Sequence, residues 1–293
     1  MISSAIRFAA YPVVVGASVA AILPIAAGEL PPWPGYALVA ALGMASVAIL
    51  ERLRPYQQAW LHDHGDLATD IVHTVVNLGL LSATALGLHA LRLDLPSVWP
   101  HHWPLWIQML LAGAVIDLGL YAMHRLSHRV DWLWRLHATH HSSERLYWLN
   151  GERRHPLSAL LLGAPGIVTA VGLGAPPAVI SAWLTLLTVH LAFQHANLDY
   201  RLGPLRYLLG VGEIHRWHHK REFEDAQVNF GEFWMFWDHL FGTFHDRSNG
   251  VQAADVGLRE AGFPQRYVDQ LRWPFRRPAS SVPSSASTRI ADR

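Results

Sequence analysis

The chain has 293 residues and a formal net charge of +1, with 51% hydrophobic and 15% charged residues. The charged share lies well below the roughly 25% that is usual in soluble domains. The sequence holds no cysteine, which excludes disulfides, thiolate ligands and cysteine-bound iron–sulfur clusters. Lys220 is the single lysine among 23 basic residues, so we interpret the arginine content as compositional bias, with no nucleic-acid partner.

Six apolar runs follow one another along the chain, as expected for a membrane protein. They cover residues 8–27, 36–50, 71–91, 105–123, 157–173 and 178–193. A span needs about 20 apolar residues, or about 17 at the short end. We therefore predict an all-α membrane bundle of four long spans, followed by a short helical hairpin that turns at residues 174–177.

The first run also has features of a signal peptide, because Arg7 precedes it and small residues lie near its end. It is longer than a typical signal sequence, and the topology favours a retained helix. We predict N-terminal transmembrane helices in residues 1–103, a catalytic region in residues 104–250 and a cytoplasmic segment in residues 251–293. The Ser- and Pro-rich tail from about residue 278 is predicted to be disordered.

Eleven of the nineteen histidines lie between His124 and His219, and eight of these form three tight boxes. Residues three or four apart share one helix face, so each box is expected to aim two or three imidazoles the same way. Three such boxes beside apolar segments indicate a site for more than one metal ion. Neutral imidazole suits Fe, Zn, Cu and Ni alike, so the ligands do not name the metal. The box ligands are His124, His128, His137, His140, His141, His215, His218 and His219.

Further candidates stand outside the boxes. His195 directly follows an apolar run and is predicted to be a ligand, because an ionisable group at a membrane face is costly unless it is used. His190, one helical turn earlier, and His155, at the mouth of the hairpin, are either ligands or supporting residues. Three polar residues are candidates for orienting a ligand imidazole through a hydrogen bond: Asp238, Asn197 and Asp117.

The arginines predict the orientation of the chain in the membrane. With Arg7 inside, the segments that carry the three boxes all fall on one face, together with most of the arginines. The loops at residues 29–34 and 92–103 fall on the other face and carry almost no arginine. Cytoplasmic loops are enriched in Lys and Arg, so the boxes are predicted to face the cytoplasm. We expect a multi-pass protein of a bacterial inner membrane.

The box spacing, together with Arg154-His155-Pro156, Asn229-Phe-Gly231 and Trp237-Asp238, resembles the fatty acid hydroxylase superfamily of sterol desaturases, sterol C4-methyl oxidases and alkylglycerol monooxygenase-like enzymes. The similarity covers residues 115–245. It implies two iron ions, which zinc can replace in a structure, and an O₂-dependent enzyme that hydroxylates or desaturates a lipid. It also implies an external electron donor of the cytochrome b5, ferredoxin or rubredoxin type.

Two other classes of function remain open from the residues alone. One is a membrane hydrolase that uses zinc to activate water, and the other is a non-enzymatic carrier of metal or haem. The chain lacks a Gly-x-Gly-x-x-Gly run, so NAD(P)H is not expected to bind. If the substrate is a lipid, its pocket is expected between the hairpin and the third and fourth runs, next to Gly166.

Overall fold

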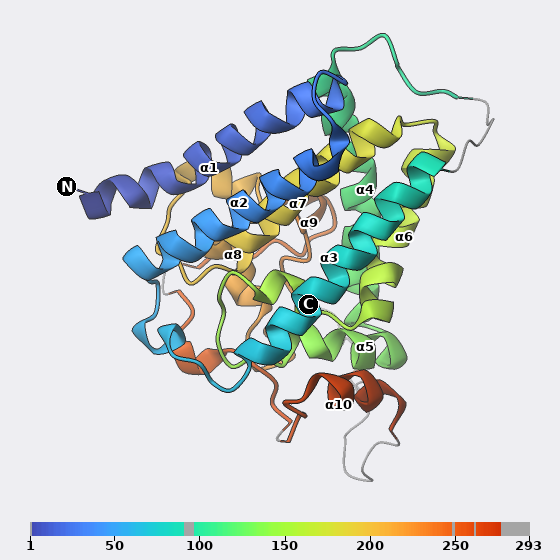
Figure 1. The fold of residues 1–293 in the computed structure, drawn as a ribbon. Coiled ribbons are helices and arrows are strands. Elements are labelled where there is room, and N and C mark those ends of the chain that lie inside the picture. The colour runs from blue at the N-terminus through green and yellow to red at the C-terminus, as the bar shows by residue number, and fades with distance from the viewer. Residues whose placement is uncertain (1, 91–96, 248–249, 261, 277–293) are drawn as a thin grey trace.

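The structure is a computed structural model that describes residues 2–90, 97–247, 250–260 and 262–276 (Figure 1). The predicted disordered tail lies outside the described residues. Six long helices coincide with the six apolar runs and confirm the predicted all-α class. They are α1 Ile2–Ala26, α2 Pro32–Leu53, α3 Leu67–Ala90, α4 Leu105–Ser127, α6 Pro156–Gly172 and α7 Pro177–His195.

Shorter helices build a polar cap at one end of the long helices; of these, α5 and α10 lie at the lower side of Figure 1. The described chain forms isolated β-bridges in the cap and no named strand. The short α-helices are α5 Asp131–His141, α8 Gly212–His218, α9 Phe236–Leu240 and α10 Tyr267–Arg272. The 3-10 helices are Gln58–Leu61, Asn150–Glu152, Gly203–Tyr207, Ala253–Asp255 and Trp273–Phe275.

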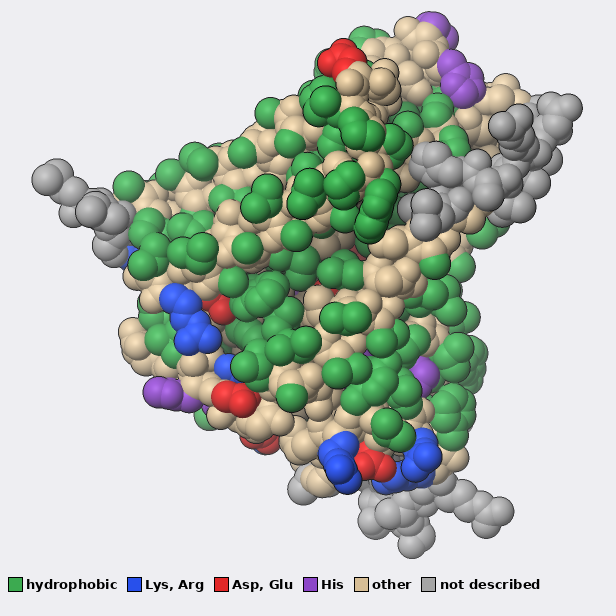
Figure 2. Space-filling view, in the orientation of Figure 1, with side chains coloured by type: hydrophobic (Ala, Val, Ile, Leu, Met, Phe, Trp, Pro, Cys, Tyr) green, Lys and Arg blue, Asp and Glu red, His purple; other side chains and the backbone are tan. Residues whose placement is uncertain are grey.

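Five of the long helices are long and apolar enough to cross a membrane, and α6 is the shorter exception. The predicted count of four long spans was therefore approximate. The second limb of the hairpin was underestimated because α7 continues past its apolar run through Gln194 to His195. Large apolar side chains on α1, α2 and α3 remain exposed, among them Phe8, Leu42 and Val75, and Figure 2 shows hydrophobic side chains over much of the bundle. These faces suit contact with lipid.

Helix α7 forms the centre of the bundle. It packs against α1, α2 and α4 (Figure 1), and every residue from Val179 to His195 is buried. A helix that is apolar on all sides is stable only where protein or lipid surrounds it. Since His195 is the last residue of α7, this packing fixes its position at the junction of bundle and cap.

Helices α4 and α6 approach each other at two glycines. A side-chain Cβ on Gly166 would overlap the carbonyl oxygen of Ile116, and one on Gly119 would overlap the backbone of Gly166. Small residues were expected to allow such an approach. The lipid pocket predicted beside Gly166 was wrong, however, because the backbone of α4 already fills that space.

Replacing Gly166 with Ala is expected to destabilise the protein by about 2 kcal/mol, because the added methyl group overpacks the contact between α4 and α6. The midpoint of thermal unfolding in detergent measures this change. Gly172→Ala is a matched control, since Gly172 lies on the same helix and a Cβ there meets open space. Equal midpoints for the two variants would contradict the tight contact.

Candidate metal centre

Five buried histidines form a first group: His124, His128, His137, His141 and His218. A second group contains four more: His140, His195, His215 and His219. Within each group one ring nitrogen per residue lies within 4.8 Å of all the others. The structure thus brings together the eight box histidines and His195, which come from α4, α5, α7 and α8 or from the residue directly after them.

Each His-x-x-His-His box divides its side chains between the two groups. In α5, His137 and His141 are four residues apart and belong to the first group, while His140 belongs to the second. In the α8 box the pattern is reversed, since His215 and His219 belong to the second group. Two histidines of each box thus lie in the same group, and the third histidine of each His-x-x-His-His box lies in the other group. Each of these two boxes therefore contributes ligands to both groups. The two groups also contact each other, since the His141 and His219 rings stack with centroids 4.7 Å apart.

The distances between ring nitrogens suit metal coordination. In the second group, the Nε2 atoms of His195, His215 and His219 lie 3.1 to 3.2 Å from one another. In the first group, His141 Nε2 lies 3.2 Å from the Nε2 atoms of both His128 and His137. Nitrogens that bind one ion at about 2.0–2.1 Å in tetrahedral directions are about 3.3 Å apart. Both groups thus have the dimensions of a metal site.

Backbone carbonyls fix the orientation of three of these rings. The Nδ1 atoms of His124, His195 and His218 lie 2.8 to 2.9 Å from the carbonyl oxygens of Phe230, Leu191 and Val228, respectively. A carbonyl only accepts, so each Nδ1 carries the proton and each Nε2 keeps its lone pair. The buried Nε2 atoms of His124 and His218 have no hydrogen-bond partner. An ion in the first group would satisfy both.

Burial keeps the imidazoles outside the spans neutral. It lowers the pKa of seven of them well below the ordinary value, since desolvation opposes the charged form. Neighbouring histidines lower the pKa further in most cases. A neutral ring is the form that binds a metal ion. The seven are His128, His137, His140, His141, His215, His218 and His219.

The loop of residues 229–235 supports the first group and is itself held by two carboxylates. Asp238 accepts hydrogen bonds from the backbone N–H groups of Phe230 and Gly231, and Asp117 accepts those of Phe233 and Trp234. Both residues were predicted to contact a ligand imidazole directly. In the structure neither carboxylate bonds to a ring. Both hold the backbone of the loop, and the Phe230 carbonyl in that loop orients His124.

Asn197 also lies away from the imidazoles. Its side chain exchanges two hydrogen bonds with the backbone of Gln57, and its N–H donates to Glu51 Oε2 at 3.1 Å. It fixes the segment that follows α2 against the end of α7. Asn197 therefore positions the backbone just after His195 and does not bond to a ring.

His155 and His190 lie outside both groups. His155 caps α6 by accepting from the N–H of Leu157, and His190 lies 2.7 Å from the Tyr11 hydroxyl and 3.1 Å from the Gly210 carbonyl. The His190 ring thus has a hydrogen-bond partner at each nitrogen, and the His155 ring caps a helix. Of the two options left open for these residues, the geometry favours the supporting one.

Sequence reasoning missed the acidic partners of the arginines near the boxes. Glu232 is fully buried, pairs with Arg154 Nη2 at 3.0 Å and lies 3.5 Å from His124 Nδ1. Asp70, at the start of α3, pairs with the buried Arg153. The signal was present, since Glu232 directly follows the Asn229-Phe-Gly231 motif. The arginine pattern indicates topology, whereas Arg153 and Arg154 form buried ion pairs within the cap.

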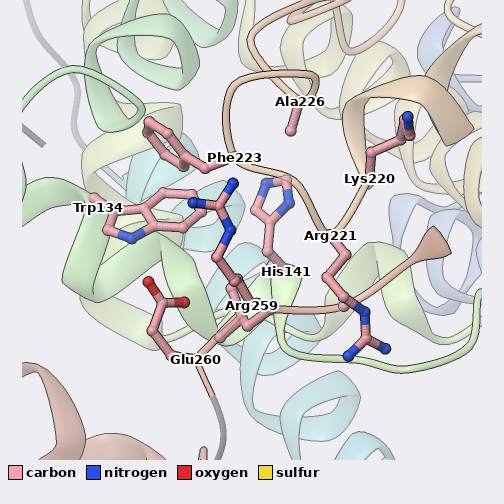
Figure 3. A pocket seen from close by; sticks show the side chains of 10 residues that line it. Trp134, His141, Lys220, Arg221, Phe223, Ala226, Arg259 and Glu260 are labelled. Atoms are coloured by element: carbon pink, nitrogen blue, oxygen red, sulfur yellow. The ribbon is translucent and has the colours of Figure 1, made fainter. Parts of the chain in front are cut away.

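A narrow cavity of about 30 Å³ reaches the first group from the surface. Figure 3 shows His141 pointing into it, with Trp134 and Phe223 on one side and Lys220 and Arg221 on the other. About 10–15 Å³ holds one water. The cavity therefore admits water or another small molecule, and it is too small for a lipid chain.

Two adjacent clusters of buried, neutral imidazoles at the end of a bundle of apolar helices define a membrane protein built to hold metal ions. Comparison with known proteins gives the family. The Fatty acid hydroxylase family model matches residues 109–243, which include all nine clustered histidines. The chain belongs to the fatty acid hydroxylase family, as the resemblance of its boxes predicted.

Relatives with established names agree with this assignment. Ornithine lipid hydroxylase OlsE of Rhizobium tropici is 34% identical over 80% of this chain and 73% of its own length. Alkylglycerol monooxygenase of Homo sapiens is 32% identical over 52% of this chain and 33% of its own length. Methylsterol monooxygenase 1 of Rattus norvegicus is 29% identical over 51% of this chain and 52% of its own length. No solved structure matches the chain.

The two groups predict a separable loss of metal. With His128→Ala, bound metal is expected to fall from about two ions per chain to about one, because only the first group loses a ligand. His215→Ala should have the same effect through the second group. Metal analysis of the purified protein measures both, and His155→Ala should retain all of its metal. Full metal content in both ligand variants would exclude the two-site arrangement.

Proposed function

We propose that this protein is a membrane-bound di-iron oxygenase that hydroxylates or desaturates a lipid with O₂ and external electrons. The observation that carries the proposal is the pair of adjacent histidine groups where α4 and α7 enter the cap. The family assignment supports it, since the relatives are named lipid hydroxylases and monooxygenases.

The donor sets support iron as the native metal. Structural zinc usually takes four ligands and catalytic zinc takes three, whereas the first group offers five nitrogens. Iron accepts imidazole ligands and works in oxygenases with coordination positions left open. When bound, the two irons would supply the oxidising power that cleavage of an unactivated C–H bond requires, which no side chain supplies alone.

The protein's own residues hold and shield this chemistry. The backbone carbonyls of Phe230, Val228 and Leu191 fix the ring tautomers, so each Nε2 faces its group before a metal arrives. The histidines of both groups are buried, with 3% or less of their surface exposed, which excludes bulk water from the reaction. The cavity beside His141 leaves a route for small molecules such as water and protons.

A bilayer lipid is the proposed substrate, because the site lies where apolar helices end and a chain can reach it from the membrane. The ornithine lipid named for the Rhizobium tropici relative supports a polar lipid with an acyl chain as the first substrate to test. Hydroxylation consumes O₂, two electrons and two protons, converts one C–H bond into C–OH and releases one water. The electrons come from a partner of the cytochrome b5, ferredoxin or rubredoxin type.

Comparative lipidomics tests the activity. Cells that express the protein are expected to contain a lipid heavier by one oxygen, or lighter by two hydrogens, that is absent from cells expressing the His128→Ala, His215→Ala double variant. The double variant serves as a control because it lacks one ligand of each histidine group and is expected to reach the membrane. A hydrolysed lipid with bound zinc would indicate a hydrolase instead, and a Soret band would indicate a haem carrier.

We also propose that the protein resides in a bacterial inner membrane with its histidines toward the cytoplasm. The absence of cysteine permits a direct test with single cysteines at exposed sites. Glu29→Cys, between α1 and α2, should react with a membrane-impermeant thiol reagent in intact spheroplasts. Asp225→Cys, in the cap, should react only after lysis. Labelling of Asp225→Cys in intact spheroplasts would reverse the orientation.

A further inference from the structure

A second and larger cavity lies on the side of α8 that faces away from the histidine groups. Its volume is about 250 Å³, below the roughly 300 Å³ at which pockets for drug-sized ligands begin. It therefore has room for a small anion or a head group and not for a whole lipid. The charged residues that line it are Arg201, Arg206, Arg216, Arg247, Glu213 and Asp246.

The lining has an excess of positive charge. Four arginines face two carboxylates, and both carboxylates already have partners. Glu213 accepts from Arg201 Nη1 at 2.8 Å, and Asp246 accepts from Arg206 Nε at 2.9 Å. Within the described part of the chain, Arg216 and Arg247 form no ion pair with a carboxylate. The lining of the cavity thus carries two more positive than negative charges.

Arg216 is held rigidly at the wall of this cavity. Only 4% of its surface is exposed, its Nη2 donates to the carbonyls of Ala196 and Leu198, and its guanidinium lies over the Tyr56 ring at 3.9 Å. Its buried Nε has no hydrogen-bond partner. That atom is covered by protein, so a ligand in the cavity would contact the part of the Arg216 side chain that lines the cavity.

The cavity lies at the level where the spans end. The N–H of Arg201 donates to the carbonyl of Arg7 in α1, and Asp199 pairs with Arg7 and with Arg54, which follows α2. Head groups of the adjacent leaflet are therefore within reach. Arg216 also connects this cavity to the second histidine group, because it follows His215 and bonds to the backbone just after His195.

We propose that this cavity binds an oxyanion, the phosphate of an anionic lipid head group or free phosphate, and that the bound anion fixes α8 against the end of α7. Guanidinium groups bind such oxygens through charge-assisted hydrogen bonds. The site is separate from the metal centre and does not depend on the proposed reaction. Binding is expected to raise the thermal unfolding midpoint even when no substrate or reductant is present.

The test uses the full chain purified in an uncharged detergent. One arm titrates inorganic phosphate and follows the unfolding midpoint, with chloride at equal ionic strength as reference. The other arm adds phosphatidylglycerol or phosphatidylcholine and counts retained lipids by native mass spectrometry. Arg247→Gln removes an exposed guanidinium without breaking an ion pair among described residues. It is expected to weaken binding about tenfold, as for the loss of one charge-assisted hydrogen bond, and Arg247→Glu should abolish it.

Arg259→Gln is the matched control, because Arg259 is also exposed but pairs with Glu222 and Glu224 beside the other cavity. It should bind like the wild type. Stabilisation by phosphate identifies a site for the free ion, and selective retention of phosphatidylglycerol identifies a head-group site. No binding in either arm would overturn the proposal. So would an equal effect of Arg247→Gln and Arg259→Gln, since a general salt effect or surface attraction would then explain the result.

Discussion

The structure depends on the burial of nine imidazoles in two small groups. Imidazole nitrogens removed from water need partners, and a buried polar atom without one is destabilising. Carbonyl oxygens satisfy one side of His124, His195 and His218, and the remaining nitrogens converge on each other. Two bound metal ions, one in each group, would give these converging nitrogens the partners that they need. Metal binding at the site is therefore expected to stabilise the cap.

The rest of the cap can be understood as support for these rings. Two carboxylates, Asp117 and Asp238, hold the loop that carries the Phe230 carbonyl, and Glu232 within that loop lies 3.5 Å from His124 Nδ1. Buried pairs such as Arg154–Glu232 connect this loop to the segment after α5. An ion pair of this kind is a weak source of stability but is costly to break. Its clearest effect here is to fix geometry around His124.

Much of the architecture could be predicted because it follows from local pattern. Six apolar runs give six helices, the spacing of the boxes identifies eight of the histidines that meet in space, and the place of His195 after an apolar run identifies the ninth. The division of the two His-x-x-His-His boxes between the groups could not be predicted, because it depends on how α5 and α8 are rotated against each other. The same holds for Asp117, which lies on an apolar helix and reaches residues 233 and 234. Such contacts join segments more than a hundred residues apart, so no local pattern records them.

The position of α8 after all six long helices has a consequence for biogenesis. Both histidine groups take side chains from the α8 box, and the loop that orients His124 comes later still, at residues 229–235. Neither group is complete until these residues have left the ribosome, by which time all the apolar helices have been synthesised. A metal ion that needs both groups would therefore bind only after the apolar helices that carry His124 and His195 have been synthesised.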